Sequence, residues 1–388
     1  MKSPRLIFFT LSIGAVISFL CPLALSQTRA AASGFKFVVG STPATNPYPQ
    51  SVAVGDFNGD GNLDLAVSVY SIGTSLSDLT ILLGNGNGTF TQGPAVTLTG
   101  QNVNNAVVAD FNGDGNLDLA ISLPDANEVQ VLLGNGDGTF TPLTPISAPS
   151  VFVIATADFN NDGKPDLALV NPGGESVTIL LGNGNGTFTK KSTISISGTP
   201  TAIAIGDFNL DGNQDLAVVD YSSQNLTILL GNGNGTFTKV AAQPATGVEP
   251  LSIAVGDLNG DDIPDLVVSN QNYGYPNAGT ITVLLGNGKG EFTPTATSPE
   301  TGSIPDTILV ADFNGDGTPD LLTSNAGSNT VSLLLGKGKG KFEKAQSFSA
   351  GTDPLGAALG EFSSSGLPDV AVANNTTSSV TVLLTELK

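Results

Sequence analysis

A nine-residue acidic segment recurs along the chain and is the feature that most limits its fold. The letters DFNGDGNLD occupy residues 56–64 and return unchanged at residues 110–118. Related copies begin at Asp158, Asp207, Asp257 and Asp312, and a weaker copy begins at Glu361. Because these starts are roughly 50 residues apart, the sequence predicts one repeat domain rather than several unrelated domains.

Each repeat has the pattern of four short strands. An apolar run leads into the acidic loop, a second run such as DLAV follows it, and a third run such as LTILLG ends in a glycine turn, GNGNG. A last segment opens with TF. The runs are rich in β-branched residues and bounded by Gly, Asn and Asp, which is typical of strands. Four strands in about 50 residues match the size of one β-propeller blade.

The two ends of the chain predict how a ring would close. The last repeat stops at VTVLLTELK, after its third strand, whereas residues 35–42 supply an additional strand before the first acidic loop. Pairing these segments would remove two open sheet edges, which a linear solenoid would leave exposed. We therefore expect an all-β, seven-bladed β-propeller with four antiparallel strands per blade, closed by the N-terminal strand, as a single domain over residues 31–388.

Residues 1–30 read as an export signal. Lys2 and Arg5 precede an apolar run, Pro22 ends it, and small residues at 24–26 suit cleavage. A retained membrane anchor is the alternative, because the apolar run is nearly long enough to span a bilayer. The signal predicts a secreted, extracellular or cell-surface protein, with the periplasm as another destination.

Composition excludes several kinds of chemistry. The single cysteine, Cys21, lies in the export signal and the chain has no histidine, so Ser-His-Asp triads, Cys-His pairs and zinc–histidine sites are ruled out. With 34 acidic against 14 basic residues, the net charge is −20. This charge argues against nucleic acids and anionic membranes, which bind through Lys and Arg, and favours a cation.

The acidic loops have the donor pattern of a calcium site. Calcium takes roughly six to eight oxygen ligands, and alternate residues of a tight loop can direct their oxygens to one centre. In the first repeat the ligands would be Asp56, Asn58, Asp60 and Asp64, with the carbonyl of Asn62. The corresponding sets are Asp110, Asn112, Asp114, Asn116 and Asp118; Asp158, Asn160, Asp162, Lys164 and Asp166; Asp207, Asn209, Asp211, Asn213 and Asp215; Asp257, Asn259, Asp261, Ile263 and Asp265; and Asp312, Asn314, Asp316, Thr318 and Asp320.

About six loops are therefore expected to bind Ca²⁺, and the seventh is degenerate. In EFSSSGLPD, Ser363 and Ser365 replace the asparagine and aspartate, and only Asp369 remains. In the fifth loop Asp262 replaces the glycine that permits the bend, which puts that bend in question. The preference of Asp, Asn and Gly for turns would explain one such loop but not six near-identical copies. An EF-hand is disfavoured because strands, not helices, flank each loop.

Phenylalanines recur once per repeat at two places, which indicates packing between blades rather than a ligand site. Six follow the first acid of a loop: Phe57, Phe111, Phe159, Phe208, Phe313 and Phe362. Six end the glycine turn: Phe90, Phe140, Phe188, Phe237, Phe292 and Phe342. The turn itself is interpreted as a hairpin, because its sixth copy, GKGKGKF, keeps only the glycines and the final phenylalanine.

The motifs DFNGDGNLD, DLAV and LLGNGNGTF resemble FG-GAP or VCBS-type repeats over about residues 35–388. This family forms the seven-bladed propeller at the head of integrin alpha subunits and occurs in many secreted bacterial proteins. The resemblance implies a calcium-binding propeller whose calcium loops lie on the face away from the ligand and have a structural role. The family also includes lectins and propellers attached to lyases or dehydratases.

Three functions fit this fold class. A secreted or surface binding and adhesion module is favoured, a glycan-specific lectin is its narrower form, and an enzyme that uses carboxylates as acid and base is the third. We expect no enzyme activity, because calcium loops already account for the acidic clusters. The expected partner is an extracellular protein or a carbohydrate, with no nucleic acid and no membrane insertion after signal cleavage, and the expected state is a monomer.

Strand parity predicts where a partner would bind. In an antiparallel blade the acidic loops and glycine turns share one end, and the second-to-third-strand and blade-to-blade connections share the other. The latter connections vary in length and hold all five tyrosines. Variable loops rich in Tyr and Asn on a rigid frame often carry recognition. The predicted ligand-binding residues are Tyr70, Asp125, Tyr221, Asn272, Tyr273 and Tyr275.

Overall fold

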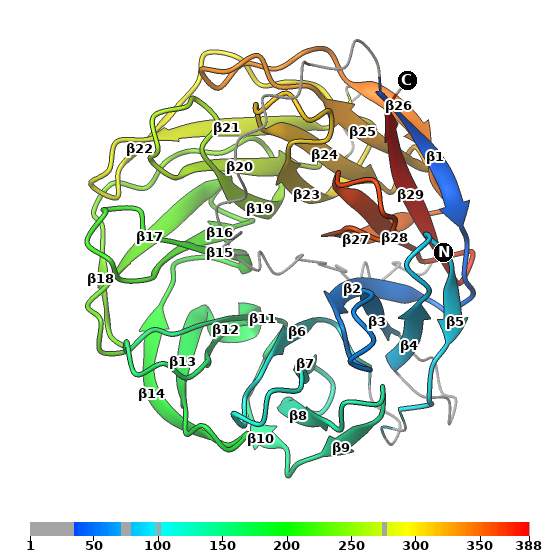
Figure 1. Ribbon diagram of the computed structural model, residues 1–388. Coiled ribbons are helices and arrows are strands. Elements are labelled where there is room, and N and C mark those ends of the chain that lie inside the picture. Colours follow the sequence, from blue (N-terminus) through cyan, green and yellow to red (C-terminus); the bar gives the residue numbers. More distant parts are fainter. Residues whose placement is uncertain (1–34, 71–78, 97, 99–101, 274–277, 388) are drawn as a thin grey trace, which may run out of the picture.

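Seven antiparallel sheets surround a common axis, as the repeats predict (Figure 1). The computed structural model describes residues 35–70, 79–96, 98, 102–273 and 278–387. The proposed export signal and Tyr275 lie outside these residues. No helix in the described ranges is long and apolar enough to cross a membrane. The predicted seven-bladed, all-β propeller is confirmed.

The blades follow one another in chain order, each from its inner to its outer strand. Blade 1 contains β2 (Pro49–Gly55), β3 (Asp64–Val69), β4 (Leu79–Gly84) and β5 (Phe90–Gln92). Blade 2 contains β6 (Ala106–Ala109), β7 (Asp118–Leu123), β8 (Glu128–Gly134), β9 (Phe140–Pro142) and β10 (Ile146–Ser147). Blade 3 contains β11 (Val153–Ala157), β12 (Asp166–Asn171), β13 (Ser176–Gly182) and β14 (Phe188–Ser195), with the short 3-10 helix η1 (Pro172–Gly174). Blades 4 and 5 contain β15 (Pro200–Gly206), β16 (Asp215–Asp220), β17 (Asn225–Gly231) and β18 (Phe237–Lys239); and β19 (Pro250–Gly256), β20 (Asp265–Asn270), β21 (Thr280–Gly286) and β22 (Phe292–Pro294). Blades 6 and 7 contain β23 (Pro305–Ala311), β24 (Asp320–Asn325), β25 (Thr330–Leu334) and β26 (Gln346–Ser349); and β27 (Pro354–Gly360), β28 (Asp369–Asn374), β29 (Ser379–Leu387) and β1 (Phe35–Ser41).

The outer strands are the least regular part of the blades. In blade 2 the outer strand is divided into β9 and β10, which both pair with β8. Pro142 and Pro145 fall in this stretch, and proline has no N–H for the ladder. In blade 6, β26 begins at Gln346, whereas the outer strands of blades 1 to 5 begin at the phenylalanine of the glycine turn.

The second strand of every blade is buried along its whole length. All six residues of β3 are buried, and the same holds for β7, β12, β16, β20, β24 and β28. Each of these strands is covered on both faces, by the blade before it and the blade after it. This is why the sequence shows a continuous apolar run such as DLAV rather than the alternation of a half-exposed strand.

Pairs of phenylalanine rings join neighbouring blades, as the sequence predicts. A ring at the start of an acidic loop meets, edge to face, the ring that ends the glycine turn of the next blade, with centroids 5.4–5.7 Å apart. The pairs are Phe57–Phe140, Phe111–Phe188, Phe159–Phe237, Phe208–Phe292 and Phe362–Phe90. Between blades 5 and 6, Leu258 replaces the first ring and packs in one cluster with Phe342.

The N-terminal strand closes the ring, as predicted. Strand β1 pairs antiparallel with β29, from Phe35 opposite Leu387 to Ser41 opposite Val382. Blade 7 has no glycine turn and therefore no phenylalanine of its own for the seam with blade 6. Phe37 of β1 supplies that ring and lies 5.5 Å from Phe313, in the same edge-to-face arrangement. Figure 1 shows β1 alongside β29 at the outer edge of blade 7.

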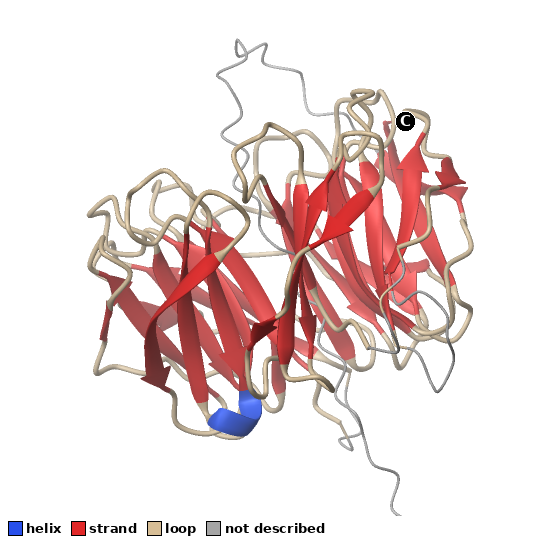
Figure 2. Cartoon of the chain, turned by 90° about the horizontal axis from the view of Figure 1, so that it is seen from below, coloured by secondary structure: helices blue, strands red, loops and turns tan. Residues whose placement is uncertain are grey.

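The two ends of the blades form distinct faces (Figure 2). The loop face consists of the acidic loops and glycine turns, residues 56–64 and 85–89 in blade 1 and their equivalents. The connection face consists of the second-to-third-strand and blade-to-blade connections. Within blade 1 the two turns of the loop face touch, because a Cβ added at Gly86, where φ is +70°, would lie 2.3 Å from Asn62 Oδ1. The predicted division into two faces is confirmed.

Loss of the Phe37 ring should weaken the closed ring. Phe37 is 9% exposed and packs on three other rings, so Phe37→Ala leaves a cavity and should lower the free energy of unfolding by about 3–5 kcal/mol. Val39→Ala is the control, since Val39 lies on the same strand but is 56% exposed. Urea unfolding measures both variants. Equal effects of the two substitutions would show that closure does not depend on this ring.

Candidate metal centre and recognition face

The first acidic loop is held by hydrogen bonds from its own backbone to its acidic side chains. Asp56 Oδ1 accepts from the amides of Gly59 and Asp60 at 2.8 and 3.2 Å, and Asp56 Oδ2 accepts from Gly61 at 2.9 Å. Asn58 Oδ1 accepts from the same Asp60 amide at 3.0 Å. The oxygens of Asp56 and Asn58 therefore converge on one point inside the loop.

The fifth and seventh loop positions are linked in the same way in six blades. The carboxylate at position five accepts from the amide at position seven at 2.8–3.0 Å. These pairs are Asp60 with Asn62, Asp114 with Asn116, Asp162 with Lys164, Asp211 with Asn213, Asp261 with Ile263, and Asp316 with Thr318. In blade 3 the Lys164 ammonium also lies 3.6 Å from Asp162.

The bend at the sixth loop position survives without glycine. Gly61 has a φ of +86°, and a Cβ added there would meet nothing within 4 Å. Asp262 of the fifth loop takes the same left-handed conformation, with a φ of +61°. The Asp262 amide still donates to Asp257 at 2.9 Å, as the Gly61 amide does to Asp56. The doubt that the sequence raised about this loop is thus removed, at a conformational cost of about 1 kcal/mol.

The aspartate at the ninth position is the most buried part of each loop. Asp64 is 0% exposed, and its two oxygens accept the amides of Phe57 and Gly84, each at 2.8 Å. The first of these bonds closes the acidic loop, and the second ties the loop to the end of the third strand. All seven blades repeat the arrangement, through Asp118, Asp166, Asp215, Asp265, Asp320 and Asp369.

The seventh loop separates this structural role from metal binding. Ser363 and Ser365 have replaced the asparagine and aspartate there, yet Asp369 is fully buried and still accepts the amides of Phe362 and Thr385. Sequence reasoning assigned the ninth aspartate to calcium alone. The signal that could have revealed its second role was the survival of Asp369 in a loop that lost its other ligands.

Burial raises the pKa of these ninth-position carboxyls. Desolvation is the largest cause, the amide hydrogen bonds oppose it, and the loop carboxylates add repulsion. The pKa of Asp215 and of Asp265 is raised to about 6, and that of Asp320 to about 7. In contrast, the pKa of the exposed Asp60 is lowered, chiefly because its carboxylate accepts a hydrogen bond from the Asn62 backbone amide. Each of the six complete loops thus places a buried carboxyl beside one half-buried and one exposed carboxylate.

The loops offer hard oxygen donors of the kind that calcium prefers. In the described ranges, however, no three carboxylate, imidazole or thiol side chains converge closely enough to form a metal group by themselves. The oxygens of Asp56 and Asn58 are gathered around a backbone amide, and Asn58 Nδ2 donates to Asp60 at 3.1 Å. The donor chemistry therefore fits a divalent cation, and the site would also need the Asn62 carbonyl and water.

On the connection face, two of the predicted ligand residues meet at one carboxylate. Tyr221 of blade 4 is hydrogen-bonded to Glu249, and burial together with the Glu249 charge raises the pKa of Tyr221 to about 12. Glu249 Oε2 also accepts the backbone amide of Tyr273 at 2.5 Å. The Tyr273 side chain is 56% exposed beside this contact. Asn272 stabilises the same connection, through bonds at 3.3 Å to Ala278 and Thr280.

The other predicted ligand residues lie elsewhere on the ring. The Tyr70 amide donates to the Tyr48 carbonyl at 2.9 Å in blade 1, and Asp125 accepts from Asn102 in blade 2. The structure therefore brings Tyr221, Asn272 and Tyr273 together but does not gather all the predicted residues into one site.

Glu249 is a residue that sequence reasoning missed. It stands before Pro250 in a left-handed conformation with a φ of +54°, although the residue before proline normally favours extended backbone. Three other residues share this position and conformation, with φ of 54–60°: Tyr48, Ile304 and Asp353. Backbone strain of this kind tends to gather at functional sites. The proline at the start of several inner strands was the available signal.

Charge separates the two faces. The described lysines all lie in acidic loops, in glycine turns or along the outer edges of blades: Lys36, Lys164, Lys190, Lys191, Lys239, Lys289, Lys337, Lys339, Lys341 and Lys344. The connection face carries Asp125, Glu175, Glu249 and Asp353 and, within the described ranges, no basic residue. Polyanions are therefore poor partners for the connection face.

Removing a ninth-position aspartate should destabilise the protein even without metal. Asp64→Ala leaves two buried amides without an acceptor, which should cost about 2–6 kcal/mol of unfolding free energy in EDTA. Asp60→Ala is the control within the same loop, and its effect in EDTA should be much smaller because Asp60 is exposed. Denaturant unfolding measures both. If the two variants are equally stable in EDTA, the structural role of Asp64 is wrong.

Comparison with solved structures supports the fold. The described propeller is similar to BBS1N in a crystal structure with ARL6DN (TM-score 0.60, 12% identity, covering 91% of this chain and 97% of that one) and to a protein from Lactobacillus plantarum (TM-score 0.63, 14% identity, 79% and 86%). It is also similar to a catalytically inactive virginiamycin B lyase from Staphylococcus aureus with quinupristin (TM-score 0.57, 15% identity, 90% and 98%). At these identities the likeness shows the fold alone.

Comparison with sequence families identifies the repeats. No curated protein matches the chain. FG-GAP-like repeats match residues 69–121, 110–169, 158–218, 207–268, 272–323 and 312–372, and an FG-GAP repeat matches residues 48–75. Most of these matches run from one acidic loop to the second strand of the next blade, so their length is that of the repeating unit seen in the structure. The chain belongs to the FG-GAP repeat family.

Proposed function

We propose that this protein is a secreted or cell-surface calcium-binding propeller that acts as a binding or adhesion module for an extracellular protein or glycan. Calcium has a structural role on the loop face, and the partner binds the connection face. The export pattern of residues 1–30 supports secretion. The observation that carries the recognition role is the contact of Tyr221 and Tyr273 with Glu249 across blades 4 and 5.

The electrostatics of the acidic loops support calcium. Each of six loops holds a buried carboxyl whose pKa is raised chiefly by burial, and repulsion from one half-buried and one exposed loop carboxylate adds to the shift. A divalent cation bound among these oxygens offsets that repulsion. The chain's own contribution is to hold Asp56 and Asn58 by the amide of residue 60, and the Asp60 carboxylate by the Asn62 amide. Because the loops lie between strands and away from the connection face, calcium stabilises the frame.

Removing calcium should lower the melting temperature markedly. Extracellular sites of this kind bind at roughly 0.1–1 mM, so millimolar calcium contributes about 1 kcal/mol per loop. With six loops, EDTA should lower the melting temperature by about 10 °C or more. Asp60→Ala should reproduce part of this loss in calcium, whereas Ser365→Ala, in the degenerate loop, should change nothing. A melting curve that is the same in calcium and in EDTA would refute calcium binding.

A binding module is favoured over an enzyme by the chemistry that the chain carries. In the similar virginiamycin B lyase, a variant that lacks one histidine is catalytically inactive, and this chain has no histidine. Its conspicuous carboxylates are engaged by backbone amides in the acidic loops. A glycan-specific lectin is the narrower form of the proposal, because exposed tyrosine rings can stack on sugars while Asn and Glu bond to hydroxyls.

The connection face can be tested with an array of glycans and extracellular matrix proteins. The calcium-loaded protein should retain at least one ligand, and Tyr273→Ala should weaken its binding about tenfold without changing the melting temperature, because Tyr273 is 56% exposed. Lys239→Ala, on the outer edge of blade 4, is the control and should bind normally. If Tyr273→Ala binds normally and substitutions on the loop face abolish binding, the assignment of faces is wrong.

A further inference from the structure

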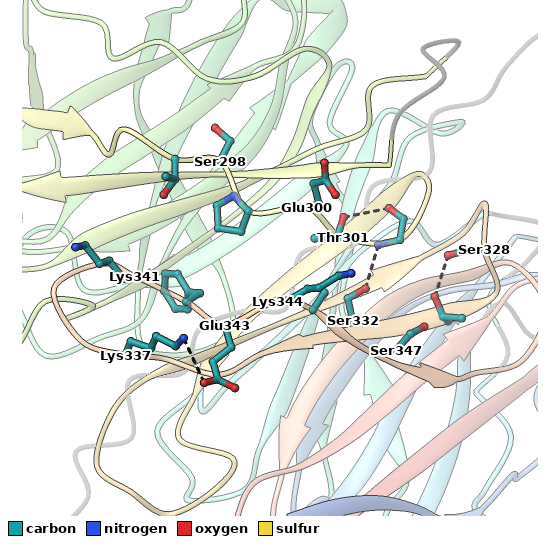
Figure 3. Close-up of a pocket in the computed structure, with 16 residues that line it drawn as sticks. Ser298, Glu300, Thr301, Ser328, Ser332, Lys337, Lys341, Glu343, Lys344 and Ser347 are labelled. Atoms are coloured by element: carbon teal, nitrogen blue, oxygen red, sulfur yellow. Dashed lines mark hydrogen bonds and ion pairs between the residues drawn. The ribbon is translucent and has the colours of Figure 1, made fainter.

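A groove runs along the outer edge of the ring between blades 5 and 6 (Figure 3). It has a volume of about 780 Å³. One wall is the segment 297–302, which leads out of blade 5, and the other is formed by β25, β26 and the turn of blade 6. Figure 3 shows Ser298, Glu300 and Thr301 on the first wall and Lys337, Lys341 and Lys344 on the second. The connection-face residues Tyr221, Glu249 and Tyr273 are not among its lining residues.

The glycine turn of blade 6 departs from the turns of blades 1 to 4. In blade 1, Asn85 Nδ2 donates to Thr89 Oγ1 at 2.9 Å, and Asn87 Oδ1 accepts from the Thr89 amide and hydroxyl at 3.1 and 2.6 Å. Blades 2 to 4 repeat these bonds. In blade 6 the three positions are occupied by Lys337, Lys339 and Lys341, which cannot form them.

The lysines occupy this turn at a local conformational cost. The turn keeps its backbone bonds, from Lys337 to Lys341 and from Gly340 to Leu258 of blade 5. Lys339, however, adopts a left-handed conformation with a φ of +55°. Three side-chain hydrogen bonds have been exchanged for three positive charges and a strained residue. Departures of this kind from the pattern of a repeat are expected at functional sites.

The irregular outer strand of blade 6 borders the groove that Lys337 and Lys341 line. Because β26 begins at Gln346, residues 343–345 run outside the regular ladder, between an isolated bridge of Phe342 with Gly336 and β26, and the Glu343 amide donates to the Leu335 carbonyl at 2.7 Å. Across the groove, the Gly302 amide donates to Ser332 Oγ at 3.0 Å and fixes the position of the opposite wall. Residues of blades 5 and 6 therefore form the groove together.

Two of the lysines are available to a ligand. Lys337 is paired with Glu343 at 3.4 Å. Within the described ranges no carboxylate lies within ion-pair distance of Lys341 or Lys344, and both side chains are exposed. At physiological salt, charges are screened beyond about 8 Å, so an anion in the groove responds to these lysines rather than to the net charge of −20.

The remaining lining defines the class of anion. Exposed hydroxyls of Thr297, Ser298, Ser328 and Ser347 accompany the carboxylates of Glu300 and Glu343. The glutamates would repel a densely charged polymer such as a nucleic acid but can accept hydrogen bonds from sugar hydroxyls. The lining also has no arginine, the residue best suited to bidentate phosphate binding. A ligand with many hydroxyls and widely spaced carboxylates fits both sets of groups.

We infer that the groove between blades 5 and 6 is a second binding site, for a glycan that carries uronate carboxylates. Lys341 and Lys344 bind the carboxylate, and the hydroxyls and glutamates of the two walls bind the neutral parts of the sugar. Segment 297–302 and Ser328 of the lining belong to connections of the connection face, but the groove does not include the proposed recognition residues Tyr221, Glu249 and Tyr273, so either site can hold without the other.

Hyaluronan oligosaccharides, which carry one carboxylate per disaccharide, provide the test. In calcium-containing buffer they should bind the protein, and carboxyl-reduced oligosaccharides of the same length should bind at least tenfold more weakly. The triple variant Lys337→Asn, Lys339→Asn, Lys341→Thr should lose at least tenfold in affinity. Its turn reads GNGNGTF, a sequence that already folds in blades 1, 3 and 4, and an unchanged melting temperature will verify this.

The matched control removes the same charge elsewhere. Lys190→Gln, Lys191→Gln, Lys239→Gln changes three exposed lysines on β14 and β18, and should alter binding less than twofold. Absence of hyaluronan binding, or equal losses in the two triple variants, would overturn the site. If the protein binds a sulfated, carboxyl-reduced oligosaccharide but does not bind hyaluronan, the groove recognises sulfate and the proposal is also wrong. Tyr273→Ala should leave hyaluronan binding unchanged, which separates this test from that of the connection face.

Discussion

The fold depends on a buried aspartate that accepts two backbone amides in every blade. In blade 1, Asp64 binds the amide of Phe57, at the start of the acidic loop, and the amide of Gly84, at the end of the third strand. A single carboxylate thus joins the first, second and third strands at one end of the sheet. Blade 7 keeps this arrangement through Asp369, although its loop has lost most of its other acidic and amide side chains.

The same loops also connect one blade to the next. The last glycine of each glycine turn donates its amide to the preceding blade. In blade 2 the Gly138 amide donates to the carbonyl of Phe57, the residue after the first acid of the blade 1 loop, at 2.9 Å. The rings of Phe57 and Phe140 pack directly beside this bond. Six seams repeat the hydrogen bond, and at the seventh the strand β1 replaces the missing turn. The loop that would hold calcium is therefore also the joint between blades, so order in a loop stabilises two blades at once.

The fold could be predicted almost completely from the sequence, whereas the sites could be predicted only in part. The repeat period, the strand patterns and the incomplete last repeat were sufficient for seven blades and for their closure. The second role of Asp64 was missed because the loop pattern does not reveal that the amide of Gly84, 20 residues later, reaches the carboxylate. Glu249 and the lysine groove were missed for a related reason. Both depend on contacts between adjacent blades, and a pattern within one repeat carries no information about its neighbour.

The register of the closing strands also determines how the ring would respond to tension. Phe35 lies opposite Leu387, so the two ends of the described chain meet at the same end of the β1–β29 pair. A load applied between these residues pulls the strands apart one hydrogen-bonded pair at a time, as in unzipping, instead of shearing all the pairs together. Each step needs little force, and once Phe37 leaves Phe313 the seam between blades 6 and 7 has lost its aromatic contact. Loaded between its ends, the propeller would open first between β1 and β29, and blade 7 would then separate from blade 1, while the chain still connects every other blade to the next.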